Sequence, residues 1–143
     1  MADVVDAATR SRMMAGIRGK NTSPEVLVRK VLHRCGYRFR LHVTNLPGRP
    51  DIVLQKYGAV IEVRGCFWHR HQNCKYAVLP KTNQRFWQSK LQSNAVRDEK
   101  TSRALRKLGW QVLVVWECQT RNEQKLDRIV SRIRKKLSEQ STT

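Results

Sequence analysis

The stretch "PDIVLQKYGAVIEVR", residues 50–64, decides the fold class. Its two apolar runs, 51–55 and 59–63, are rich in β-branched residues, and a turn at Tyr57-Gly58 separates them. This pattern predicts two short strands joined as a hairpin. Side chains two residues apart share one face of a strand, so Glu62 and Arg64 are expected to point the same way.

Hydrophobic periodicity on either side of the hairpin predicts further helices and strands. Helices are expected over 22–36, 84–108 and 122–137, and strands over 37–43 and 110–116. We therefore expect an α/β fold, with a mixed central sheet flanked by helices. Residues 22–137 are expected to form one domain, preceded by a basic arm over 1–21 and followed by a disordered tail over 138–143.

The charge balance indicates the class of partner. The chain carries 29 Lys and Arg against 11 Asp and Glu, a formal net charge of +18. A polyanion is the expected partner, and nucleic acid is the commonest one, with a membrane surface as the alternative. No apolar run approaches the roughly 20 residues of a membrane-spanning helix, and no secretory signal is visible. We expect an intracellular protein whose four cysteines are thiols or metal ligands.

Two carboxylates are expected at one end of the hairpin. Asp51 begins the first strand and Glu62 ends the second, so the sheet can bring them together beside Arg64. Two carboxylates and a cationic side chain are what a hydrolytic Mg²⁺ site requires. The pattern resembles the PD-(D/E)xK nuclease superfamily, with arginine in place of the usual lysine. The alternative is a surface ion pair between Glu62 and Arg64.

The loop "GCFWHRHQNC", residues 65–74, contains candidate metal ligands. His71 and Cys74 have ligand spacing, Cys118 follows the last strand, and Asp98 belongs to the nearby helix. These four residues would close a structural Zn²⁺ site. The alternative is a polar loop whose histidine and cysteine bind no metal. Cys35 and Cys66 are expected to be packed thiols.

The same loop carries a candidate base and a candidate DNA wedge. His69 has the pKa range of a general base and is close in sequence to the carboxylates, although it could also bind zinc. Phe67 and Trp68 lie in a basic loop and are expected to insert between base steps. Phe86-Trp87 could add a stacking surface, and core packing at a helix start is the alternative.

Taken together, these motifs resemble one family. The segments "LPGRPD" at 46–51, "GCFWH" at 65–69, "FW" at 86–87 and "LGWQVLVVWEC" at 108–118 are similar to the very short patch repair (Vsr) endonucleases. So is "MADV" followed by the basic arm "ATRSRMM". The resemblance covers roughly residues 1–120. It implies an enzyme that nicks the thymine strand at T·G mismatches, which arise when 5-methylcytosine deaminates.

The resemblance also implies roles for individual residues. Asp51 and the backbone carbonyl of Val63 would bind Mg²⁺, with His69 as the base that activates water and Glu25 as a further active-site residue. His71, Cys74, Asp98 and Cys118 would bind a structural zinc ion. Phe67, Trp68 and Trp87 would wedge beside the mismatch from the major groove, and Met14 would approach from the minor groove. The implied setting is the nucleoid in the cytoplasm of a bacterium, with contact to mismatch-repair proteins left open.

Two positions depart from the family pattern. Position 62 is often apolar and position 64 is usually histidine, whereas this chain has Glu62 and Arg64. Arginine cannot act as a base at neutral pH. Two alternatives therefore stay open, namely a PD-(D/E)xK nuclease of different duplex specificity and a zinc-containing mismatch-binding protein with weak or no cutting. A monomer is expected, since a lesion on one strand has no two-fold symmetry.

Overall fold

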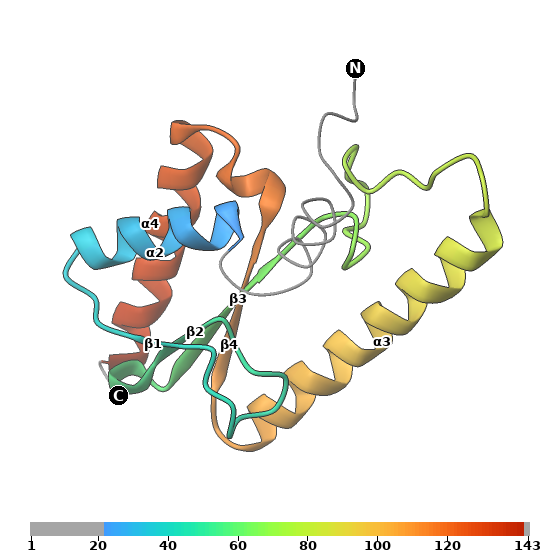
Figure 1. Cartoon of the computed structure of the whole chain (residues 1–143). Helices are drawn as coiled ribbons and strands as arrows, with labels where there is room; N and C mark the ends of the chain where they lie inside the picture. Colours follow the sequence, from blue (N-terminus) through green and yellow to red (C-terminus); the bar gives the residue numbers. More distant parts are fainter. Residues whose placement is uncertain (1–21, 142–143) are drawn as a thin grey trace, which may run out of the picture.

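The computed structural model describes residues 22–141, which form one sheet with helices on both sides (Figure 1). The predicted basic arm, with Met14, and residues 142–143 lie outside the described part. The strands lie in the order β1-β2-β3-β4. The elements, in chain order, are α2 (Ser23–Arg34), β1 (Arg40–Leu41), β2 (Ile52–Leu54), the 3-10 turn η1 (Gln55–Tyr57), β3 (Ala59–Arg64), α3 (Gln84–Lys107), β4 (Gln111–Trp116), the 3-10 turn η2 (Glu117–Thr120) and α4 (Glu123–Ser141).

The hairpin that was predicted from the sequence is confirmed. β2 and β3 are antiparallel, with Ile52 opposite Ile61. Gly58 closes the turn in the left-handed conformation, at φ 61°. β4 lies parallel to β3, with Val63 opposite Val115, because α3 carries the chain back to the same end of the sheet. The mixed α/β sheet is therefore as expected.

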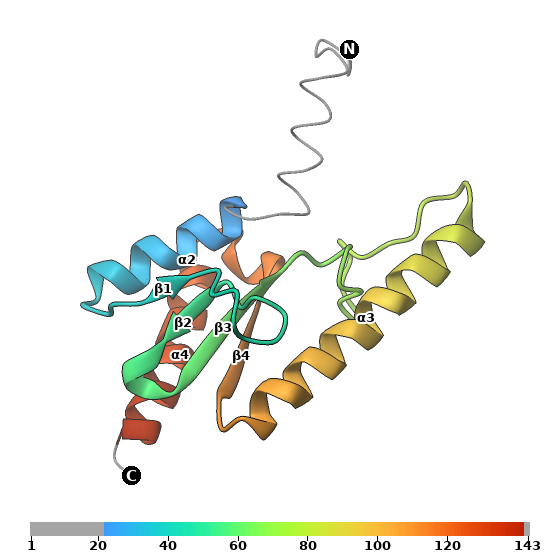
Figure 2. The same cartoon turned by 60° about the horizontal axis from the view of Figure 1, so that its bottom comes forward.

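Different helices pack on the two faces of the sheet. Figures 1 and 2 show α2 and α4 on one side of the sheet and α3 on the other. Alternate residues of β3 follow this division, since Ala59 and Ile61 belong to the core with α2 and α4, whereas Val60 packs with Leu105 of α3. Both cores meet the sheet, which holds the ends of β2 and β3 in fixed positions.

Two predicted segments differ from the structure. The strand expected over 37–43 covers only Arg40–Leu41, and it ends there because His42 has a φ of 48°, outside the extended region. The helix expected to end at residue 137 continues to Ser141, into the segment that was expected to be a disordered tail. None of the helices in the described part of the chain is long and apolar enough to cross a membrane.

Candidate active site and metal centre

Asp51 lies just before β2, in a half-buried position at the end of the sheet. The backbone N–H of Val63 donates a 2.7 Å hydrogen bond to its Oδ2. Burial raises the pKa of Asp51 to about 7, against the effect of the Val63 hydrogen bond, and the negative charges of Glu25 and Glu62 add to the rise. A divalent cation would oppose all three unfavourable effects, so the electrostatics around Asp51 suit a cation ligand.

Two further side chains lie next to Asp51. His42 Nε2 is 2.8 Å from Glu25 Oε1, and His42 Nδ1 is 3.9 Å from Asp51 Oδ1. One donor atom from each of the three residues falls within 4.8 Å of the other two, so the group could hold a metal ion. Glu25 was expected here from the family resemblance. His42 was not, because strand alternation placed it on an outer face.

Glu62 and Arg64 do share one face of β3, as predicted, but they bind each other. Arg64 Nη2 donates to Glu62 Oε2 at 2.6 Å and to Ser102 Oγ of α3 at 3.2 Å. The Arg64 guanidinium also lies 5.8 Å from the centre of the Trp116 ring. Glu62 is not in the group of metal donors around Asp51. The ion-pair alternative raised from the sequence therefore describes this pair, although the pair lies partly buried.

His69 contacts a carboxylate of α3. Its Nδ1 lies 2.7 Å from Oδ2 of Asp98, and both side chains are half-buried. A carboxylate at Nδ1 favours the tautomer with a proton on that nitrogen, which leaves the lone pair on Nε2. A proton on His69 would lower the pKa of Asp51, so the two side chains are close enough to interact electrostatically.

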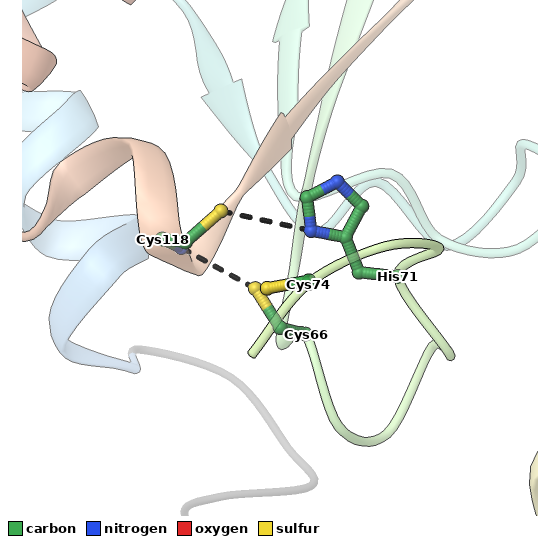
Figure 3. A group of neighbouring side chains, drawn as sticks. All are labelled: Cys66, His71, Cys74 and Cys118. Carbon is green, nitrogen blue, oxygen red and sulfur yellow. Dashed lines mark hydrogen bonds between the residues drawn. The ribbon is translucent and has the colours of Figure 1, made fainter. Parts of the chain in front are cut away.

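The zinc ligand set expected from the sequence needs one correction. The structure gathers Cys66, His71, Cys74 and Cys118, with donor atoms within 4.8 Å of one another (Figure 3). Asp98 does not belong to this group, because its carboxylate faces His69 instead. Cys66, expected to be a packed thiol, supplies the fourth donor and is fully buried.

The loop and η2 position these four donors. The N–H of His71 donates to the Cys66 carbonyl at 2.9 Å, which folds the loop back on itself. His71 stacks on Trp116 at 4.0 Å, with the rings 7° from parallel, and its Nδ1 lies 3.6 Å from Cys118 Sγ. Figure 3 shows all four side chains directed toward a common centre.

The chemistry of this donor set fits zinc. Three thiols and one imidazole are a standard tetrahedral Zn²⁺ environment. Burial raises the pKa of the Cys66 thiol to about 12, and burial likewise raises the pKa of Cys118. Burial lowers the pKa of His71, which keeps its imidazole neutral and able to bind a metal. A bound Zn²⁺ would compensate the cost of buried thiolates, because it pairs with their charge.

Three of the aromatic side chains form a cluster beside this site. The ring centres of Phe67 and Trp68 are 5.1 Å apart, and both lie within 6 Å of Trp87 at the start of α3, at 5.5 and 5.9 Å. Phe86 contacts Trp87 at 5.2 Å and is 57% exposed. Trp87 therefore packs against the other two rings, and Phe86 is mostly exposed and is not a core residue.

Comparison with known proteins decides the family. The family model described as DNA mismatch endonuclease Vsr matches residues 2–75. The chain belongs to the Vsr family. The Vsr protein of Escherichia coli, named as a DNA mismatch endonuclease, is 44% identical over 126 residues, which is 88% of this chain and 80% of that protein.

Two other Vsr relatives are named as type II nicking enzymes. V.XorIIP of Xanthomonas oryzae is 45% identical over 83% of this chain and 87% of its own length. V.NmeAIP of Neisseria meningitidis is 42% identical over 94% of this chain and 98% of its own length. This Vsr-family chain is therefore a DNA-nicking endonuclease, and the side chains around Asp51 and His69 are its candidate catalytic residues.

Proposed function

We propose that this enzyme nicks the thymine strand at T·G mismatches, depends on Mg²⁺, and is stabilised by a structural zinc ion. One observation carries the proposal. The paired aromatic residues Phe67 and Trp68 directly precede His69, which contacts Asp98 and acts electrostatically on Asp51. A group able to open the base stack and a group able to hydrolyse the backbone are thus on one short loop.

Asp51 and the backbone carbonyl of Val63 would hold the catalytic cation, with Glu25 close by. Two properties of the site support this assignment: the raised pKa of Asp51 and the burial of Glu25. When bound, Mg²⁺ would supply Lewis-acid polarisation of the scissile phosphate and lower the pKa of bound water. The sheet order is compatible with a restriction-endonuclease-like core.

His69 would act as the general base. With the Nδ1 proton directed at Asp98, Nε2 is the nitrogen able to accept a proton from the attacking water. Asp98 would hold the ring in this orientation and stabilise the imidazolium that forms. The hydroxide would then attack phosphorus, the P–O bond to the leaving sugar oxygen would break, and that oxygen would take a proton from solvent.

Recognition of the mismatch would use the aromatic cluster. Inserting an apolar side chain between base steps costs a few kcal/mol of stacking, and a mismatched pair costs the least to open. Phe67, Trp68 and Trp87 contact one another, so they would enter the duplex as one packed unit. The net charge of +18 supplies the attraction to the phosphate backbone.

The proposed zinc ion would be structural. Its four donors join the loop after β3 to η2 after β4, so the ion would hold the loop against the parallel strand pair. A monomer in the bacterial cytoplasm, at the nucleoid, is the setting that fits a repair enzyme acting on one strand of duplex DNA.

A nicking assay tests the proposal. Each strand of a T·G duplex would be labelled in turn, with a fully paired duplex of the same sequence as the control. We expect a nick in the thymine strand alone, in the presence of Mg²⁺. His69→Gln should remove nicking and retain mismatch binding, whereas the matched variant His33→Gln, at an exposed histidine of α2, should cut normally.

A second candidate is a nicking enzyme whose duplex specificity differs. The description of V.XorIIP and V.NmeAIP as type II nicking enzymes favours it. Placing the mismatch in several sequence contexts separates the two. Equal cutting of mismatched and paired duplexes would overturn the T·G proposal, and tight binding without cutting in every context would indicate a binding-only protein.

A further inference from the structure

His42 has an unusual backbone conformation for a non-glycine residue. Its φ of 48° is in the left-handed region, which costs about 1 kcal/mol or more for a residue that has a β-carbon. Its backbone N–H donates to the carbonyl of Asp51 at 3.3 Å. The turn at His42 therefore places the imidazole beside Asp51, instead of on the outer face of β1. Strained residues of this kind concentrate at functional sites.

One ring nitrogen of His42 faces Glu25, and the other faces Asp51. Nδ1 lies 3.9 Å from Asp51 Oδ1, which is too far for a hydrogen bond. Two ligands of one octahedral cation with bonds of about 2.1 Å lie about 3.0 Å apart when they are adjacent and about 4.2 Å apart when they are opposite. The 3.9 Å between Nδ1 and Oδ1 falls between these values, so the pair leaves room for a cation and would adjust slightly on binding it.

Glu25 is placed to orient the ring. Its side chain is only 2% exposed, and its Oε1 lies 2.8 Å from His42 Nε2. Glu25 Oε1 also lies 3.8 Å from Nη2 of Arg29, and its close contact with His42 is an electrostatic one that is not aligned as a hydrogen bond. A buried carboxylate on one nitrogen and a metal on the other is the usual arrangement around a metal-binding histidine.

We propose that His42 is a ligand of the catalytic cation, and that this nitrogen ligand makes the site bind Mn²⁺ more tightly than Mg²⁺. Mg²⁺ prefers an all-oxygen environment, whereas imidazole is a good ligand for divalent first-row transition metals. Asp51 gives the site its charge, His42 gives it selectivity, and Glu25 holds the imidazole in place. The inference rests on the cation site of the proposed function.

Electron spin resonance of Mn²⁺ bound to the zinc-loaded enzyme provides the direct test. The imidazole nitrogen should produce a ¹⁴N coupling to Mn²⁺ in the pulsed spectrum of the wild type. We expect His42→Gln to lose this coupling. His69→Gln, which removes the other nearby imidazole, should keep it. Retention of the coupling in His42→Gln would overturn the proposal.

Affinity measurements give an independent readout. Calorimetric titration with MnCl₂ and with MgCl₂ should show that His42→Gln weakens Mn²⁺ binding by about tenfold or more, and Mg²⁺ binding by clearly less. An unchanged ratio of the two affinities would contradict a nitrogen ligand. If His42→Gln fails to fold, the His69→Gln variant can be labelled with ¹⁵N-histidine instead. The Mn²⁺ spectrum should then change with the isotope, and a spectrum that does not change would exclude His42 as a ligand.

The outcomes separate this inference from the proposed function. Mismatch nicking by an enzyme whose Mn²⁺ shows no histidine coupling would remove His42 from the ligand set and leave the proposed function intact. Histidine-bound Mn²⁺ in a protein that nicks no mismatched duplex would support the ligand and overturn the proposed function.

Discussion

His69 and Asp98 are 29 residues apart in the sequence, yet His69 Nδ1 lies 2.7 Å from Asp98 Oδ2. The contact joins the loop after β3 to the middle of α3. It fixes which nitrogen of His69 can accept a proton, and it removes Asp98 from the set of zinc ligands. A single substitution at Asp98 can therefore distinguish the zinc ligand that the sequence predicted from the partner of His69 that the structure shows.

Asp98→Asn should slow nicking by about a hundredfold or more, because the amide favours the wrong tautomer of His69 and stabilises the imidazolium less. Zinc content should stay equal to that of the wild type. Single-turnover cleavage of a T·G duplex and metal analysis of the purified protein measure the two effects. Loss of zinc together with activity would return Asp98 to the ligand set.

Cys66→Ser should release zinc and lower the melting temperature, because a neutral hydroxyl replaces one of three thiolates at the metal. Cys35→Ser is the matched control, since Cys35 is an exposed thiol remote from the cluster. Zinc stoichiometry and thermal unfolding are the measurements. Equal zinc content in the two variants would show that the ligand set is wrong.

Asp51→Asn should change how stability depends on pH when no Mg²⁺ is added. Burial raises the pKa of Asp51 from its ordinary value of 3.8 to about 7 in the folded protein. The raised pKa favours folding below pH 4, and that advantage is lost as the pH rises through 7. Asparagine does not titrate. The free energy of unfolding of the variant, relative to that of the wild type, should therefore increase by on the order of 2 kcal/mol between pH 5 and pH 8.

Urea unfolding of the zinc-loaded proteins at both pH values tests this. Addition of Mg²⁺ at pH 8 should stabilise the wild type and leave Asp51→Asn almost unchanged. A stability difference that does not depend on pH would contradict the raised pKa of Asp51.

Arg64→Met should destabilise the fold by about 2 kcal/mol, because it leaves the partly buried Glu62 carboxylate without its cation. The double variant Arg64→Met/Glu62→Leu should recover much of that loss, since no unpaired charge remains. Urea unfolding gives both values. If Arg64 instead binds the scissile phosphate, Arg64→Met will lose nicking activity while its stability stays near that of the wild type.

His42→Gly should be more stable than His42→Ala by about 1 kcal/mol. Both variants lack the imidazole, but only glycine adopts a φ of 48° without strain. Thermal unfolding of the two variants, compared with each other rather than with the wild type, isolates the backbone effect. The opposite order would mean that residue 42 is not left-handed in solution.

The sequence predicted the secondary structure well where a periodic pattern was long. The hairpin, α3 and β4 lie where alternation and helical spacing placed them, and Glu25 came from the family resemblance. His42 could not be found this way, because alternation from Tyr37 onward assigns it to the outer face. Only a left-handed φ reverses that assignment, and "LHVTN" contains no glycine that would have required one.

One of the four candidate zinc ligands, Asp98, was predicted wrongly, because its place depends on how the loop folds. The spacing of His71 and Cys74 marked both as ligands, and Cys118 was added because it follows the last strand. The choice between Cys66 and Asp98 depended on how the loop folds. The hydrogen bond from the His71 N–H to the Cys66 carbonyl turns Cys66 toward the other donors, and this contact is not visible in a linear sequence.

One stretch of α3 supports much of the loop that carries the aromatic residues. The Asn94 side chain donates to the carbonyl of Trp68 at 3.0 Å, and Asp98 contacts the very next residue, His69. A duplex that resists unstacking would press the loop away from this helix and part His69 from Asp98, whereas a duplex that yields would leave the contact in place. The rate of cutting would then depend on the stiffness of the DNA. The enzyme would discriminate between duplexes after binding as well as during it.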